Sequence, residues 1–205
     1  MGRLALLIGV LAATACGSSS TTTPSGSSTS PSSTLGTFQN TFHAEVSETA
    51  GDAVATAGVP TPPDLIHGTL DVDGGLLKVT LQFAPGTLSP STVATILLDT
   101  DQNAATGYND SGYGIDYGVS LYASTQAFIQ KANPSSCASG GNCYTLVGMS
   151  SISLGTDTIA TIIPLSTLGN ADGRLSYRVF AGAPATATMT TDVMPDMALP
   201  PARVP

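Results

Sequence analysis

The sequence is poor in basic side chains and in the nitrogen ligands that many metal and catalytic sites use. Its 205 residues include 6 lysines and arginines against 14 aspartates and glutamates, with 2 histidines and no tryptophan. So few cations cannot build the positive surface that sequence-independent binding to phosphate backbones requires, so we expect no nucleic-acid partner. The same imbalance repels an anionic membrane face, so any membrane attachment has to come from a covalent lipid or an apolar segment.

Motifs that assemble a nucleophile with its base are also lacking. The sequence contains no His-Glu-x-x-His, no Gly-x-Ser-x-Gly and no glycine-rich phosphate loop. We therefore predict that the chain is not an enzyme. The alternative is a carboxylate-dependent hydrolase of surface polysaccharide, because acids are plentiful. Against it, Asp99 and Asp101 lie on one turn, and the sequence indicates no opposing wall for a substrate.

The N-terminus has the pattern of an export signal. Residues 1–15 combine Arg3, the apolar run Leu4–Ala13 and a small-residue exit, and the run is too short to span a bilayer. Ala13-Thr14-Ala15-Cys16 resembles the bacterial lipobox, in which signal peptidase II cleaves before a diacylglyceryl cysteine, although Ala13 replaces the usual leucine. We predict lipidation of Cys16. The alternative is an ordinary signal peptide that leaves a free thiol.

Residues 16–37 follow as a Ser/Thr/Gly/Pro segment that cannot bury enough apolar surface to fold. We predict a disordered tether with a reach on the order of 25 Å. The lipobox resemblance implies outer-membrane or cell-surface delivery, because Gly17 stands where an aspartate marks inner-membrane retention. Residues 38–205 then form a single domain.

The two remaining cysteines, Cys137 and Cys143, enclose a short flexible segment. In an oxidising compartment we expect them to form a disulfide. Closing so short a loop contributes only about 2 kcal/mol, so the bridge trims a hairpin tip and does not hold the fold.

Short apolar segments with turn residues between them predict strands through most of the domain. The expected strands cover residues 65–72, 76–83, 92–98, 115–122, 127–131, 144–149, 158–163 and 175–182. An Asp-Gly turn joins the first two as a hairpin. In the fourth, alternation places Tyr117 in the core and Asp116, Gly118, Ser120 and Tyr122 in solvent.

This pattern predicts an all-β fold, an antiparallel two-sheet β-sandwich of immunoglobulin or jelly-roll type, with a closed barrel as the alternative. Residues 164–169 are expected to form one helical turn. The proline-rich tail after Pro195 is expected to be an extended strap or a frayed end.

One acidic segment indicates a metal. Asp99, Asp101 and Asn103 alternate on a turn, and Asp116 approaches from the next strand. Oxygen ligands without His or Cys favour calcium over zinc or copper. The segment is not an EF-hand, because Ala104 stands where that loop needs glycine and no helices flank it. The alternative is that these side chains only cap a tight turn.

The order of several short motifs resembles secreted bacterial β-sandwiches related to DOMON domains and family nine carbohydrate-binding modules. The resemblance covers roughly residues 60–200. The motifs are Leu98–Asn103, Thr106-Gly107, Gly114–Tyr117, Ile163–Ser166 and Asp192–Asp196. It implies a sandwich with a calcium-binding acidic loop and relatives that bind sugars or haem.

Sugar-binding relatives stack their ligand on aromatic platforms, and without tryptophan the available rings are Tyr108, Tyr113 and Tyr122. Haem is disfavoured, because neither histidine belongs to a ligand motif and the methionines are scattered. The leading hypothesis is thus a surface-displayed, non-enzymatic module that uses calcium and binds carbohydrate or another surface component. A structural or assembly lipoprotein without a ligand site is the alternative.

Overall fold

The computed structural model describes residues 42–54, 61–110, 113–169, 171–182 and 190–204. The predicted signal peptide, Cys16 and the tether lie outside the described residues. Within them, no helix is long and apolar enough to cross a membrane.

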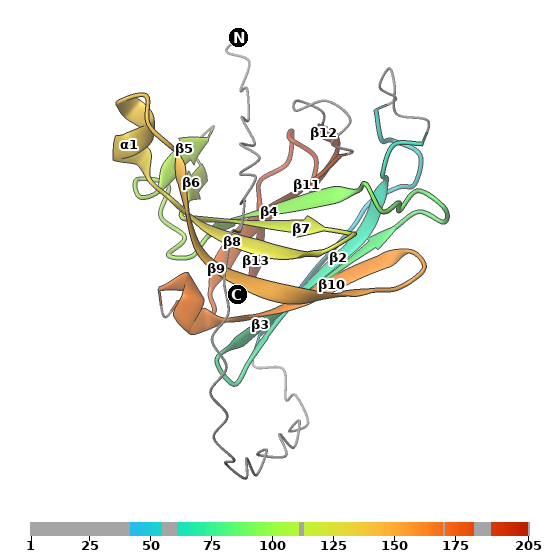
Figure 1. Cartoon of the computed structure of the whole chain (residues 1–205), viewed down its shortest axis with the longest axis horizontal. Helices are drawn as coiled ribbons and strands as arrows, with labels where there is room; N and C mark the ends of the chain where they lie inside the picture. Colours follow the sequence, from blue (N-terminus) through green and yellow to red (C-terminus); the bar gives the residue numbers. More distant parts are fainter. Residues whose placement is uncertain (1–41, 55–60, 111–112, 170, 183–189, 205) are drawn as a thin grey trace, which may run out of the picture.

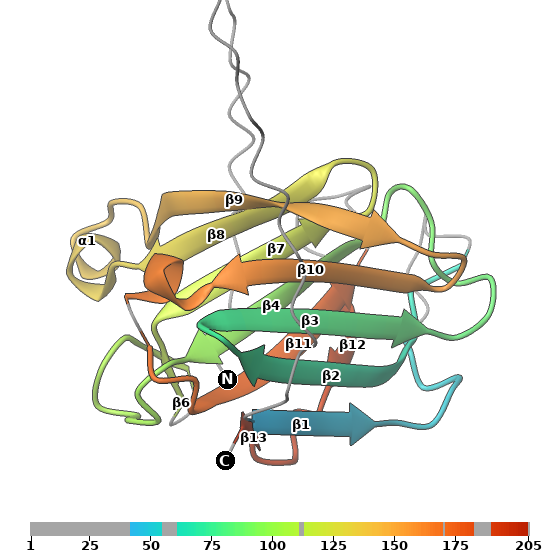
Figure 2. The ribbon, with the colours of Figure 1, turned by 90° about the horizontal axis from the view of Figure 1, so that it is seen from below.

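Antiparallel strands build the domain in two layers, as predicted. The first sheet consists of β1 (Phe42–Ser47), β2 (Leu65–Asp73), β3 (Leu76–Phe83) and β10 (Thr158–Pro164). The second sheet consists of β4 (Val93–Asp99), β7 (Tyr117–Tyr122), β8 (Gln126–Ala132), β11 (Leu175–Gly182), β12 (Thr190–Met194) and β13 (Ala202–Val204). Figure 2 looks through the first sheet onto the second.

Strand β9 (Tyr144–Leu154) joins the two sheets along one side. Residues 144–151 pair with β8 of the second sheet, and residues 152–154 pair with β10 of the first. The hydrogen-bonded order therefore runs β1-β2-β3-β10-β9-β8-β7-β4-β11-β12, with β13 also on β11. The order has ends at β1 and β12, so the described strands form an open sandwich and not a closed barrel.

The core lies between the sheets and follows from strand alternation. In β3, Leu77, Val79, Leu81 and Phe83 are fully buried while the residues between them are partly or fully exposed. They meet apolar side chains of β4, β7, β8 and β11 in one cluster. Each such side chain stabilises the fold by roughly 1.5–3 kcal/mol on burial. Tyr117 belongs to this cluster, as predicted.

The prediction that the other face of β7 is exposed was wrong for two residues. Gly118 and Ser120 are buried. A Cβ on Gly118 would lie 3.7 Å from the ring of Tyr144 and 3.9 Å from Leu97, so neighbouring side chains cover this face.

A small two-stranded sheet, β5 (Tyr108–Asp110) and β6 (Tyr113–Ile115), was not predicted as a unit. Tyr113 and Ile115 bury Leu97, whose side chain belongs to a cluster separate from the main core. Strand β4 is therefore covered on both faces, which explains its nearly unbroken apolar sequence.

Other local predictions can be compared directly. The hairpin between β2 and β3 is confirmed, and Gly74 and Gly75 adopt positive φ at its turn. The helical turn is confirmed as a 3-10 helix, Leu165–Leu168. The tail is not frayed, because β13 pairs with the start of β11.

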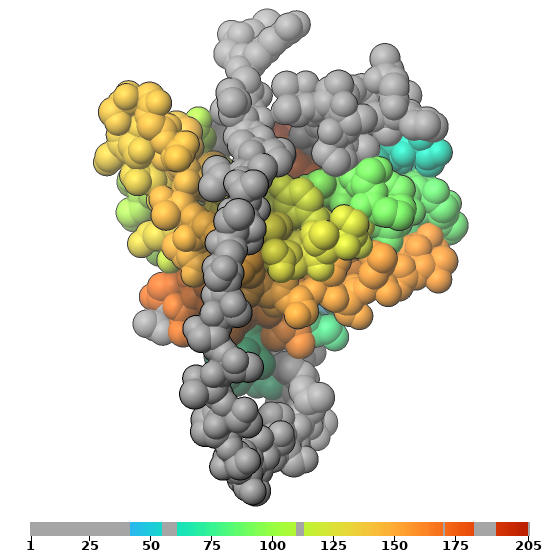
Figure 3. Space-filling model, viewed as in Figure 1, coloured from blue at the N-terminus to red at the C-terminus, as the bar shows by residue number. Residues whose placement is uncertain are grey.

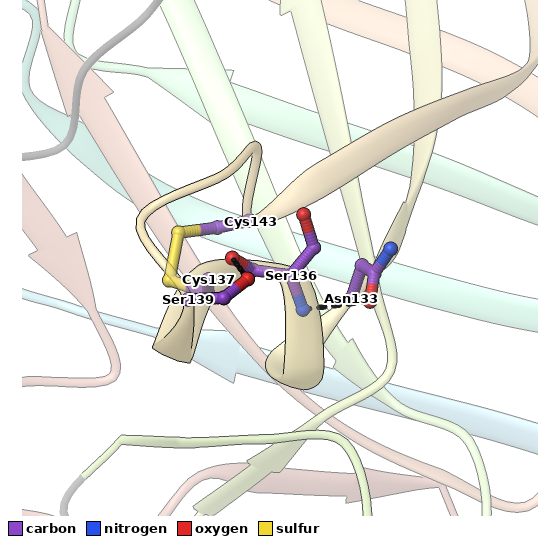
Figure 4. Close-up of a disulfide and its surroundings, with 5 residues drawn as sticks. All are labelled: Asn133, Ser136, Cys137, Ser139 and Cys143. Atoms are coloured by element: carbon purple, nitrogen blue, oxygen red, sulfur yellow. Dashed lines mark hydrogen bonds between the residues drawn. A yellow bond between two sulfur atoms is a disulfide. The ribbon is translucent and has the colours of Figure 1, made fainter.

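The predicted disulfide between Cys137 and Cys143 is confirmed, with a Cα–Cα distance of 4.2 Å. It links a short helix, α1 (Pro134–Ala138), to the start of β9, and Figure 4 shows it beside the helix cap. The Asn133 side chain accepts a hydrogen bond from the Ser136 N–H at 3.2 Å. Figure 3 shows the α1 segment standing out at one end of the molecule, and α1 has no buried residue.

Candidate metal centre

The acidic loop begins where a buried strand ends. Asp99 is the last residue of β4 and is only 4% exposed. Asp116 lies between β6 and β7, where its N–H donates to the Leu98 carbonyl at 2.8 Å and its carbonyl accepts from Ala132 at 2.7 Å. Both carboxylates therefore rise from backbone that is fixed by strand pairing.

Three of the predicted ligands come together. Asp99, Asp101 and Asp116 each place a carboxylate oxygen within 4.8 Å of the others. Calcium binds oxygen at about 2.3–2.6 Å, so oxygens on two sides of one ion lie up to about 5 Å apart. Asp99 is buried, Asp116 is half-buried and Asp101 is exposed, so the group opens to solvent on the Asp101 side.

The carboxylates of this group repel one another. Burial raises the pKa of Asp99, and the Asp101 side chain and the charge of Asp116 raise it further, while the Asn103 N–H opposes the shift. In the described part of the chain, no lysine, arginine or histidine forms an ion pair with these three aspartates. A divalent cation bound here would remove this repulsion.

Hydrogen bonds hold the carboxylates in position. Asp116 Oδ2 accepts from the N–H and the hydroxyl of Thr100, both at 2.9 Å. Asp101 accepts from the Thr106 hydroxyl at 2.9–3.0 Å. An ionised carboxylate has about four lone-pair sites, so these contacts leave room for a cation. The sequence analysis did not predict that Thr100 and Thr106 support the carboxylates, although both lie close to the aspartates in sequence.

Asn103 caps the turn, and its predicted role as a metal ligand stays a prediction. Its side-chain oxygen accepts from the Ala105 N–H at 3.1 Å, and its own N–H donates to Asp101 at 2.9 Å and to Asp99 at 3.2 Å. These are the turn-capping contacts of the alternative hypothesis. Asn103 thus shapes the loop, and the carboxylate oxygens of the three aspartates are the candidate ligands.

The loop closes tightly against the following strands. Gly107 has φ +66°, and a Cβ at this position would collide with the Ile115 carbonyl oxygen and lie 2.9 Å from Asp116 Oδ1. Gln102 also has a positive φ of 53°, and its side-chain amide donates to the Val204 carbonyl at 3.1 Å. The loop backbone is therefore fixed at both sides of the carboxylate group.

The predicted tyrosine platform does not form. Tyr113 is 5% exposed, and its hydroxyl lies 2.6 Å from the Leu97 carbonyl oxygen and 2.8 Å from that of Ser176, sharing its proton between them. Burial and the charge of Asp99 raise the pKa of Tyr113. The prediction that Tyr113 is available to a ligand was wrong, because its hydroxyl satisfies buried backbone under β6.

The other two tyrosines lie far apart. Tyr108 is half-buried and packs with Tyr113 beside the acidic loop. Tyr122 is at the far end of β7, opposite Val93, with its ring edge-to-face to Phe128 at 5.3 Å. Tyr122 is five positions after Tyr117 along the strand, a distance of about 16 Å. Of the three predicted rings, Tyr108 alone is both near the candidate metal centre and only half-buried.

Comparisons with known proteins add no evidence on function beyond the fold and this loop. The relationship to DOMON domains and family nine modules stays a prediction. No protein-family model matches the chain, and comparison with curated proteins and with solved structures gave no match either.

Proposed function

We propose that this protein is a lipid-anchored, non-enzymatic binding module whose β-sandwich takes up calcium at Asp99, Asp101 and Asp116. The observation that carries the proposal is the convergence of three carboxylate oxygens within 4.8 Å. One of these carboxylates is buried at a strand end without a basic partner in the described chain.

Calcium suits this donor set better than other common metals do. The three aspartates supply only hard oxygen ligands, which disfavours zinc and copper. Magnesium demands near-ideal octahedral geometry, whereas calcium tolerates irregular sites of six to eight oxygens. The exposed side at Asp101 leaves positions for water or for oxygen atoms of a ligand.

A bound ion would connect separate parts of the second sheet. Asp99 ends β4, Asp116 precedes β7, and Asp101 belongs to the loop between them. Calcium would therefore fix this loop cluster relative to the strands. A rigid loop cluster loses less conformational entropy when it binds a partner.

Surface display is the second part of the proposal. Lipidation at Cys16 and the tether of residues 16–37 would hold the domain away from the outer membrane, facing carbohydrate or another surface component. The acidic composition agrees with contact to neutral or cationic groups.

Binding fits the acidic group better than hydrolysis does. The two carboxyl groups of a glycoside hydrolase flank the scissile bond at about 5–9.5 Å from each other. Here one oxygen from each of three carboxylates gathers around one point, and two of the three aspartates are only two residues apart at the end of β4.

Calcium titration with thermal melting tests the proposal. At a calcium concentration of about one hundred times Kd, a site present only in the native state adds about 2.7 kcal/mol. For a domain of this size, that raises Tm by roughly 5–10 °C. Asp101→Asn should remove the part of the rise that this site contributes, because one of its three carboxylates loses its charge. Asp101 is exposed, so the substitution itself disturbs little packing.

Glu45→Gln is the matched control, since it removes one charge from a side chain that is 64% exposed and outside the acidic loop. An equal calcium response in wild type, Asp101→Asn and Glu45→Gln would show that the aspartates only cap a turn. A glycan array with calcium-loaded protein and with chelated protein then tests carbohydrate binding.

A further inference from the structure

A second group of acids lies at the opposite end of the sandwich. Asp52, Asp64 and Asp192 each place a carboxylate oxygen within 4.8 Å of the others. Asp64 directly precedes β2, Asp52 follows β1, and Asp192 belongs to β12. In Figures 1 and 2 the segment after β1 lies at the end of the domain away from β5 and β6.

The distance between the two acidic groups can be measured along strand β11, because one aspartate of each group pairs with a residue of this strand. Ser176 pairs with Asp99, and Ala181 pairs with Asp192. Five residues of strand correspond to about 16 Å. The second group is therefore distinct from the candidate metal centre.

Two carboxylate oxygens in this region are sealed from solvent and have no hydrogen-bond partner among the described residues. Asp64 is 6% exposed, and its Oδ1 has no partner. Glu48, whose charge interacts with those of Asp52 and Asp192, has an equally isolated Oε2. A buried ionised oxygen without a partner is strongly destabilising, and a bound cation would supply the missing partner.

Backbone amides orient the second oxygen of Asp64 and of Glu48, and they also bind Asp192. Gly51 donates to Asp64 Oδ2 at 2.7 Å, and Val193 donates to Asp192 Oδ1 at 2.8 Å. Asp196 donates from its N–H to Glu48 Oε1 at 3.0 Å. Because each carboxylate is held through one oxygen, the partnerless Asp64 Oδ1 and Glu48 Oε2 also have fixed positions.

In the part of the chain that the structure describes, no basic side chain neutralises the group. In the described ranges, none of its four acids forms an ion pair with lysine, arginine or histidine, and residues 55–60 and 183–189 contain no such residue in their sequence. Burial and the charge of Asp192 raise the pKa of Glu48 to about 7. Burial and the charges of Asp52 and Asp64 raise that of Asp192 to about 6, against two backbone hydrogen bonds.

We propose that Asp52, Asp64 and Asp192, flanked by Glu48, form a second site for a hard divalent cation of the calcium class. All its donors are carboxylate oxygens, and one side is open at the exposed Asp52. The proposal does not depend on the Asp99 site.

The site would close the side of the sandwich that faces away from β9. Asp64 leads into β2 of the first sheet, and Asp192 lies in β12 of the second. The Leu65 N–H already donates to Asp192 Oδ2 across this gap. A cation here would join the two sheets where no strand does so in the described chain.

Calorimetric titration of the purified protein with calcium alone tests the second site. Wild type should bind two ions, and Asp101→Asn, which disables the first site, should still bind one. Asp64→Asn should also bind one, and the double variant none. Binding of one ion by wild type and none by Asp101→Asn would overturn the proposal, as would unchanged binding in Asp64→Asn.

Glu48→Gln supplies a test that does not depend on Asp64→Asn folding. It should weaken the second calcium by roughly 10- to 100-fold. It should raise Tm in chelator, because a buried negative charge is removed, and lower Tm in calcium, because a charged neighbour of the ion is lost. If Glu48→Gln changes Tm in the same direction in chelator and in calcium, Glu48 has only a structural role, and the proposal that it flanks the ion is overturned. Glu45→Gln, with its exposed side chain, should change neither measurement.

Discussion

Gly107 shows how closely single residues fix the acidic loop. It has positive φ, and its Cα faces the Ile115 carbonyl so closely that any side chain would collide with backbone. Gly74 has a positive φ as well, but nothing lies within 4 Å of the position of its Cβ. Alanine at Gly74 would therefore suffer only the strain of a positive φ, whereas alanine at Gly107 would suffer both this strain and a collision with backbone.

We predict that Gly107→Ala lowers the free energy of unfolding by roughly 2–5 kcal/mol, because left-handed strain and overpacking add. Gly74→Ala should cost only about 1–2 kcal/mol from the strain alone. Urea denaturation of both variants measures the difference, and equal losses would contradict the predicted collision.

His43 gives a pH dependence at the residue scale. Its Nδ1 lies 2.6 Å from Asp71 Oδ1 and its Nε2 lies 3.6 Å from Glu45. The hydrogen bond to Asp71 raises the pKa of His43 above its ordinary value of 6.5. Because the folded-state pKa is the higher one, the stabilisation is fully present below about pH 6.5 and is lost as pH rises through the folded value.

We therefore expect His43→Gln to lower Tm at about pH 5.5 and to change it little at about pH 9. Asp71→Asn should abolish the same acid-side stabilisation. Thermal melting across this pH range in chelator checks both variants, and a greater loss at the alkaline end would contradict the sign.

At the scale of elements, the disulfide segment is attached to the sandwich and is not part of its core. Helix α1 has no buried residue, and the bridge closes a separation of only six residues. We expect the double variant Cys137→Ser, Cys143→Ser to lose about 2 kcal/mol and to keep the calcium response. Hydrogen exchange should increase around α1 alone, whereas increased exchange in β4 or β11 would refute this view.

Most strands were predictable because their burial alternates along the local sequence. The expected strand at 175–182 matches β11, and the hairpin at 65–83 was read from its Asp-Gly turn. Strand β13 was not predicted. Its three residues, in a proline-rich tail, are too few to show an alternation of apolar and polar side chains, and they pair with β11, which is distant in sequence. Helix α1 was missed for its length, although Asn133 followed by Pro134 is a cap signal.

The two acidic groups also differ in how far they could be predicted from local sequence. Asp99 and Asp101 are neighbours in sequence with Asp116 close behind, so a local pattern predicted that they converge. Asp64 and Asp192 meet only through tertiary structure, since Leu65 and Asp192, which share a hydrogen bond, are 127 residues apart. The burial of Tyr113 was equally hidden, because its partners Leu97 and Ser176 come from two other strands.

At the scale of the whole molecule, we propose a domain with cation sites at both ends and a lipid at its N-terminus. We predict that Cys16→Ser moves the protein from the membrane fraction to the soluble exported fraction and abolishes incorporation of labelled palmitate. Cys137→Ser should retain the label. Loss of the signal peptide without lipidation in wild type would favour an ordinary signal peptide.

The most direct test of the central claim is a crystal structure grown in millimolar calcium, with anomalous scattering used to locate the ion. We predict one calcium bound by oxygens of Asp99, Asp101 and Asp116 at about 2.3–2.6 Å, with water in the open positions beside Asp101. An ordered loop in which these carboxylates contact only water and the amides and hydroxyls of the turn would contradict the account.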